Sequence, residues 1–197
     1  MAAFFSSLEK TIGAGFVLLV AVIILISLVT GQWFRMDHGW FAFVVRWLHV
    51  LSGIMWIGLL YYFNFVQTPT MPKIDPAELR VGVTKFILPQ ALFWFRWAAM
   101  ATMVLGLLLA WMNGYIVQAL TFQKGFLPIG IGMWLGLIMA YNVWMIIWPN
   151  QKKVLGLTEA TADEKAAAGR MAGMTSRINT MLSIPMLYCM IVQQHGV

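Results

Sequence analysis

Charged residues are scarce in this sequence. Of its 197 residues, 10% are Asp, Glu, Lys or Arg, whereas 61% are hydrophobic. A soluble domain carries about 25% charged residues, and a domain of this size still exposes about a third of the surface of its unfolded chain. The missing polar surface must therefore face lipid, and a soluble domain with a large core is excluded.

Cysteine is also nearly absent, because Cys189 is the only one. A single cysteine excludes a disulfide within the chain and a C-x-x-C-H motif for covalently attached c-type haem. The net charge is +6, but Lys and Arg lie mostly between apolar segments. This distribution favours membrane topology and argues against binding of nucleic acid.

Five apolar segments are long enough to cross about 30 Å of hydrocarbon. They predict an all-α, polytopic membrane helix bundle that forms a single transmembrane domain over residues 1–197. The predicted spans are about 12–30, 40–65, 89–112, 128–148 and 178–194. Proline is expected to end the second span before Pro69 and the fourth at Pro149, and to open the third near Pro89.

A short cytoplasmic helix is expected to lead into the fifth span. Thr161 and Glu164 form a capping-box pattern that marks the beginning of this helix. Gly132 and Gly136, two small residues four positions apart in the fourth span, are expected to allow close approach of another helix.

The positions of Lys and Arg predict the orientation. Cytoplasmic loops are rich in these residues, and an N-terminus in the cytoplasm leaves only Arg35 and Lys124 in the outer loops. The C-terminus then lies on the outer face. The basic residues on the cytoplasmic side are Lys10, Lys73, Arg80, Lys85, Lys152, Lys153, Lys165, Arg170 and Arg177.

Three ionisable side chains fall inside predicted spans: Arg46, His49 and Arg96. Such residues are costly in a bilayer and point to function by default. The second to fifth spans contain no Asp or Glu. A buried arginine must therefore find an anion that the helices do not supply, or extend to the membrane surface.

His49 is the candidate ligand of a cofactor. It lies about nine residues, or about 13 Å, inside the outer end of its span. Gly53 and Trp56 follow at i+4 and i+7 on the same helix face, so the histidine stands beside a gap suited to a flat macrocycle. Arg46, at i−3, is placed to pair with a haem propionate. The sequence equally allows a purely structural interpretation, in which His49 forms a hydrogen bond with a backbone carbonyl and Arg46 extends to the membrane surface.

Three residues are candidates for a second ligand of the metal. His195 ends the fifth span but lies nearer the surface than His49. Met186 and Met190 share one helix face and match His49 in depth, although ordinary packing also explains them. A haem b with either ligand, or with an open sixth position, is chemically permitted.

Other polar residues have structural explanations. Arg96 lies in the aromatic segment Phe93–Trp97, where cation–π contacts and a lipid phosphate are both within reach. Asn64, Asn142 and Asn179 are expected to form one interhelical hydrogen-bond cluster near the cytoplasmic ends of their spans.

The segment Arg46–Gly58 resembles the membrane domain of bacterial urate hydroxylase, the cytochrome-c-linked urate oxidase. The resemblance continues over most of the chain, through Tyr61–Gln67, Phe93–Trp97, Asn142–Lys153 and Thr175–Gly196. A shorter pattern, His49 with a small residue at i+4, Trp at i+7 and Gly at i+9, is also similar to the haem-binding helix of membrane protoporphyrinogen oxidases and to copper-resistance D-type membrane proteins.

The resemblance implies a bacterial inner-membrane protein in which His49 ligates haem b. Full-length urate hydroxylases carry a C-terminal cytochrome c domain, whereas this sequence ends at Val197 without a haem-c motif. Electrons are therefore expected to leave through a separate cytochrome or membrane partner. No constellation suited to a purine edge is found, so neither a substrate nor a catalytic residue is assigned.

Three functions follow from these observations. The leading one is a membrane redox protein with haem b. The first alternative is a non-catalytic accessory subunit of a larger respiratory or oxidase complex. The second is transport of copper or a small solute, prompted by 15 methionines and by His38 and His195 at the outer face.

Overall fold

The computed structural model describes residues 5–33, 35–76 and 78–193, and these residues form helices, turns and loops without a strand. The predicted all-α fold is therefore confirmed for this part of the chain. Contacts divide the chain into residues 1–41 and residues 42–197, and each unit is described by itself.

The first unit contains helix α2 (Leu8–Thr30). It begins four residues before the predicted span because the Ser7 side chain accepts a hydrogen bond from the Lys10 amide and caps the helix. It ends at Gly31, whose φ of 68° is left-handed. The apolar segment 12–30 is helical throughout.

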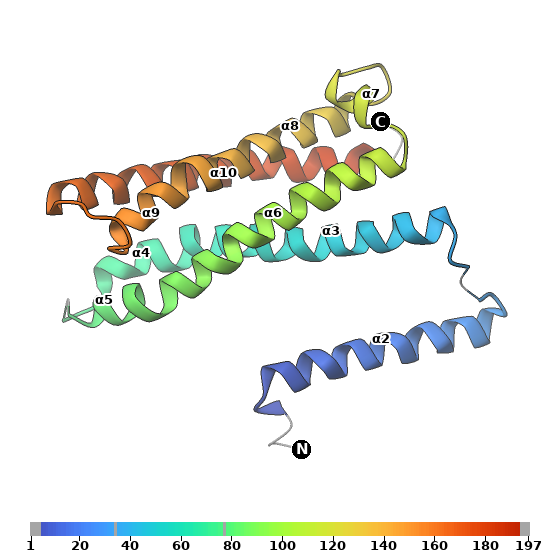
Figure 1. Cartoon of the computed structure of the whole chain (residues 1–197), viewed down its shortest axis with the longest axis horizontal. Coiled ribbons are helices and arrows are strands. Elements are labelled where there is room, and N and C mark those ends of the chain that lie inside the picture. The colour runs from blue at the N-terminus through green and yellow to red at the C-terminus, as the bar shows by residue number, and fades with distance from the viewer. Residues whose placement is uncertain (1–4, 34, 77, 194–197) are drawn as a thin grey trace. The chain divides into compact units, whose positions relative to one another are not determined.

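The second unit is built from long helical stretches that run alongside one another (Figure 1). The first contains α3 (His38–Tyr61), η1 (Tyr62–Gln67), α4 (Thr68–Thr70) and η2 (Met71–Lys73). The second contains α5 (Leu79–Gly82), η3 (Val83–Ile87) and α6 (Leu88–Met112), followed by the short α7 (Ile116–Leu120). The third contains α8 (Leu127–Tyr141), η4 (Asn142–Ile147) and α9 (Trp148–Val154), and α10 (Ala162–Val192) completes the unit.

Four of the described helices are long and apolar enough to cross a membrane: Leu8–Thr30, His38–Lys73, Leu79–Met112 and Leu127–Val154. Residues 178–192 of the fifth predicted span lie within α10, whose first half is polar, and α10 is not among these four; residue 194 lies outside the described residues. A total of five spans therefore stays a prediction. The capping box of Thr161 and Glu164 is confirmed at the beginning of α10.

The prediction that proline ends or opens the long helices is wrong at Pro69, Pro89 and Pro149. Each helix continues through its proline, and each proline follows a π-helical segment that ends two residues earlier. Proline lacks an N–H, and its ring clashes with the carbonyl four residues before it. In all three cases that carbonyl lies inside the wider π turn, which accommodates the ring without breaking the helix.

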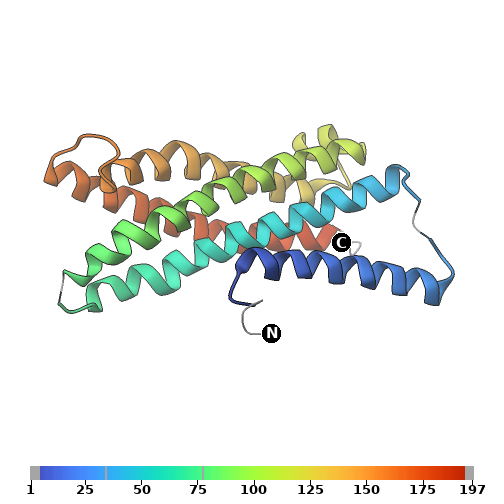
Figure 2. The same ribbon diagram turned by 60° about the horizontal axis from the view of Figure 1, so that its bottom comes forward.

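Helices α8 and α10 run side by side in both ribbon views (Figures 1 and 2). Gly132 makes this approach possible, because a Cβ atom there would lie 3.1 Å from Cys189 Cβ. This confirms the close approach expected at Gly132. The neighbouring Gly136 faces Met103 of α6 at an ordinary distance of 3.8 Å.

Interhelical hydrogen bonds connect α10 to its neighbours. Asn142 Nδ2 donates to Asn179 Oδ1 at 2.8 Å, and Asn179 Nδ2 donates to the Met139 carbonyl at 3.0 Å. Asn64 Nδ2 donates instead to Ser176 Oγ, at 2.8 Å. The predicted cluster is thus confirmed for Asn142 and Asn179, while Asn64 bonds to the same helix one turn away.

We expect Asn179→Ala to lower the free energy of unfolding by about 1–2 kcal/mol, because the fully buried amide makes two interhelical hydrogen bonds. Thr180→Ala is the control, since the Thr180 hydroxyl bonds only within α10, to the Ser176 carbonyl. Its effect should stay within about 0.5 kcal/mol. Denaturation in detergent measures both values, and equal losses would contradict this assignment.

Candidate cofactor-binding site

A cavity of about 670 Å³ lies between α3, α6, α8 and α10. Its volume falls in the range of about 300–1,000 Å³ that is usual for cofactor and ligand sites. The lining is mainly apolar and includes methionines from three helices: Met103, Met133, Met186 and Met190. We call the end of the second unit at which α7 lies the α7 end, and the opposite end the α9 end (Figure 1).

The His49 imidazole is held in one orientation. Its Nδ1 atom lies 2.9 Å from the carbonyl oxygen of Thr102 on α6. A carbonyl accepts only, so Nδ1 carries the proton and donates it. The neutral ring then has its free lone pair on Nε2, which has no hydrogen-bond partner among the residues described. His49 also lines the cavity.

Gly106 provides the space for this ring. A Cβ atom at Gly106 would lie 2.8 Å from His49 Cε1, closer than real Cβ contacts permit, and at a tight 3.1 Å from Nδ1. Thr102 and Gly106 are four residues apart and therefore share one face of α6. This face supplies both the hydrogen-bond acceptor and the gap that the imidazole occupies.

Gly53 does not lie beside the open gap that the sequence predicts next to His49. Its Cβ position would lie 3.9 Å from the Thr102 side-chain methyl, so α6 packs against α3 at ordinary van der Waals distance there. Gly53 still lines the cavity. The small residue that makes room for the imidazole is Gly106, on α6.

The cationic part of the site lies at the α7 end. A smaller hollow of about 240 Å³ is lined there by Arg46, Tyr115, Phe126, Ile129, Met190 and Gln193. Arg46 forms no salt bridge within the described chain, although its charge acts on the Tyr115 hydroxyl. Burial raises the pKa of Tyr115 above its ordinary value, and the charge of Arg46 partly opposes this. Tyr115 therefore stays a neutral O–H donor near the guanidinium.

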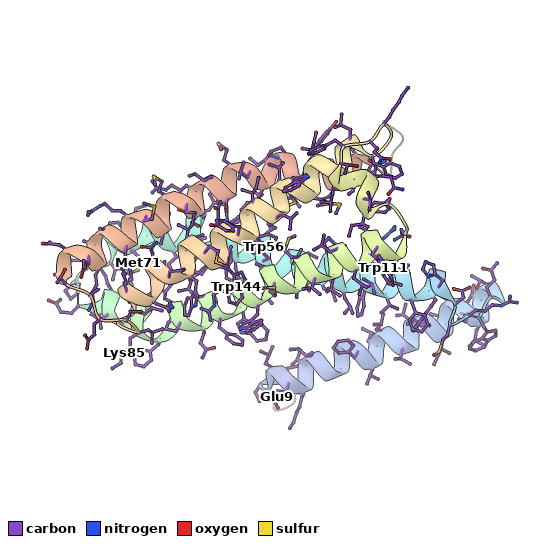
Figure 3. The ribbon with its side chains drawn as sticks, turned by 45° about the horizontal axis from the view of Figure 1, so that its top comes forward. Glu9, Trp56, Met71, Lys85, Trp111 and Trp144 are labelled. Carbon is purple, nitrogen blue, oxygen red and sulfur yellow. The ribbon has the colours of Figure 1, made fainter. Side chains whose placement is uncertain are left out.

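The structure brings most of the predicted site residues to one cavity. Its lining includes Arg46, His49, Gly53, Trp56, Met186 and Met190. Trp56 lies in the middle of the bundle (Figure 3) and is 1% exposed, and its Nε1 has no hydrogen-bond partner among the described side chains and backbone. His195 lies outside the described residues, and His38 is exposed at the beginning of α3.

Several lining residues were not identified from the sequence. Thr102 and Gly106 stand in the apolar second half of α6, and a polar or small pair at i and i+4 is a recognisable interhelical contact signal. Tyr115 gives no such signal, because it reaches the site only through the turn after α6. Its ring stacks on Phe126 with centroids 5.9 Å apart and planes 19° apart.

Arg96 lies apart from the residues that line this cavity. Its guanidinium carbon is 3.4 Å from the ring centroid of Trp148 in α9. The expected cation–π contact is therefore present, but its partner is on another helical stretch and not in the segment Phe93–Trp97. The ring offsets part of the cost of placing this charge near the interior.

The C-terminal part of the chain resembles a known protein family. Residues 112–197 match the urate oxidase N-terminal family. This match agrees with the resemblance found in the sequence, over α7, α8, η4, α9 and α10, which is less than half of the chain. The match does not include α3, which carries Arg46 and His49. No curated protein and no solved structure matches the chain.

We expect Gly106→Ala to destabilise the protein by about 1–3 kcal/mol, because the new methyl group overlaps the His49 ring. Gly58→Ala is a matched control, since Gly58 lines the same cavity and a Cβ there meets no atom within 4 Å. Thermal unfolding in detergent compares the two variants. Equal stabilities would show that the imidazole does not occupy the position described.

Proposed function

We propose that this protein is a membrane-bound redox protein that holds one b-type haem in the cavity between α3, α6, α8 and α10. One observation carries the proposal. His49 is fixed through Nδ1 by the Thr102 carbonyl, at 2.9 Å, while its Nε2 has no partner among the described residues and the ring borders an apolar cavity of about 670 Å³.

The hydrogen bond to Thr102 prepares His49 to act as a metal ligand. Histidines that bind metals usually donate the second ring N–H to a carbonyl or carboxylate, which fixes the tautomer and raises the basicity of the ligating nitrogen. Gly106 leaves room for the ring beside α6, so the imidazole would already be positioned when a metal binds. Both features support a ligand more than a histidine that serves packing alone.

Arg46 would hold the acidic side of the cofactor. It lies one turn from His49, lines the cavity and forms no salt bridge with any described residue. The Tyr115 hydroxyl would add a hydrogen-bond donor at the same end, where it lines the smaller hollow beside Arg46. A ligand with carboxylates at one edge and an apolar body matches this distribution of charge.

Met186 and Met190 are the candidates for a second ligand to the metal. Both line the cavity from α10, and thioether ligation of haem is chemically established. Met186 is buried, and Met190 packs beside Gly132 of α8. Haem, when bound, supplies one-electron chemistry, and in this protein the electron would be passed from a small substrate or quinol to a separate cytochrome.

The proposed location is a bacterial inner membrane with the N-terminus in the cytoplasm. Four helices of membrane length support a membrane protein. The positions of Lys and Arg support the orientation, which places the α7 end, and with it Arg46, on the periplasmic side. A cytochrome partner would then approach from that side.

We expect His49→Ala to abolish haem binding, and His38→Ala, on the exposed first residue of α3, to leave it unchanged. The haem-to-protein ratio of purified samples from haem-supplied cells measures this. A ratio near zero in both variants and in the unmodified protein would contradict the proposal. Fixed co-purification with a larger complex would then favour an accessory subunit.

We expect Arg46→Gln to weaken haem binding about tenfold, the loss of one charge-assisted hydrogen bond of roughly 1.5 kcal/mol. Loss of a nearby positive charge should also lower the midpoint potential, because it favours the oxidised metal. Lys124→Gln removes a charge from a loop and is the control. An unchanged affinity and potential in Arg46→Gln would show that this residue faces no acidic group of the cofactor.

A further inference from the structure

One side of the cavity is edged by exposed apolar residues. Val50, Ile54 and Gly58 are spaced by four residues along α3, and all three line the cavity while remaining exposed, Ile54 at 65%. Leu187 and Ile191 form a second such pair on α10 and are 37% and 60% exposed. The cavity therefore has an apolar opening between α3 and α10.

This opening follows from the way the two helices diverge. Close backbone contacts between α10 and the first helical stretch are concentrated in η1, toward the α9 end. There the Tyr61 hydroxyl donates to Ser183 Oγ at 2.9 Å, because the Ser183 hydroxyl itself donates to the Thr180 carbonyl. The bond between Tyr61 and Ser183 closes the cleft toward the α9 end. From that point α3 and α10 separate toward Arg46.

The α7 end is covered by other contacts. Gln193 accepts a hydrogen bond from the Ile129 amide at 3.3 Å and donates to the Gly125 carbonyl at 2.9 Å, which ties α10 to the beginning of α8. Four residues line both the cavity and the smaller hollow: Arg46, Tyr115, Ile129 and Met190. These side chains therefore lie between the two spaces.

We propose that the cavity takes up its ligand sideways from the lipid bilayer, through the cleft between α3 and α10, and not through the α7 end. The inference rests on the proposed function and adds the route of loading and the class of ligand. The exposed edges are apolar except at Arg46, which is also exposed and lies at the α7 end of the α3 edge. Among the described lining residues, Arg46 supplies the permanent positive charge. The ligand is a flat, membrane-dissolved molecule with carboxylates at one edge, as haem is.

The experiment compares rates of loading. Protein freed of haem is placed in lipid nanodiscs and mixed with vesicles that contain haem, and the rise of the Soret band is followed. Ile54→Trp and Leu187→Trp fill the cleft from its two edges. Val104→Trp is the matched control, because Val104 is 55% exposed on α6 and does not line the cavity. Gln193→Ala loosens the α7 end.

We expect Ile54→Trp and Leu187→Trp each to slow loading roughly tenfold. Val104→Trp and Gln193→Ala should load at the unmodified rate. Equal rates in the cleft variants and in Val104→Trp overturn the lateral route, and so does faster loading by Gln193→Ala.

A second measurement keeps this test independent of haem. Leu107 lines the cavity from α6, so Leu107→Cys in a Cys189→Ser background reports access to the interior. A lipid-soluble maleimide should label it faster than a charged one, and Ile54→Trp should slow that labelling. Faster labelling by the charged reagent overturns the inference. A protein that shows lateral labelling but binds no haem loses the proposed cofactor and retains the lateral cleft.

Discussion

The hydrogen bond from His49 Nδ1 to the Thr102 carbonyl is the contact on which the site depends. It joins α3 to α6, selects one tautomer of the imidazole, and leaves the second ring nitrogen at an apolar cavity. It also requires a glycine at position 106, because any larger residue would occupy the volume of the ring. Without this bond the cavity would be a packing defect between helices, with no defined ligand.

The two ends of the second unit have different roles. Toward the α9 end, the bonds of Asn179 with Asn142 and Met139 and of Tyr61 with Ser183 fix α10 against its neighbours. The cavity lies toward the α7 end, beyond Tyr61 and Ser183, where α3 and α10 diverge. The bonds of α10 with Tyr61 and Asn142 thus lie toward one end, while the cavity lies toward the other, an arrangement that suits a preorganised site.

The sequence predicts some of this arrangement and misses the rest for physical reasons. Helix periodicity places Arg46, His49 and Trp56 on one face of α3, and they do line one cavity. The helix boundaries predicted at proline were wrong, because the preference of a single residue does not reveal the π turns that precede each proline. Gly106 could not be paired with His49, since that contact joins two helices whose relative register depends on tertiary packing.

The central claim is that a b-type haem is bound in this cavity. The most direct measurement is a reduced-minus-oxidised absorption spectrum of the purified, unmodified protein after expression with ample haem. We expect the sharp difference bands of a haem with at least one histidine ligand. A flat difference spectrum from well-folded protein would contradict it.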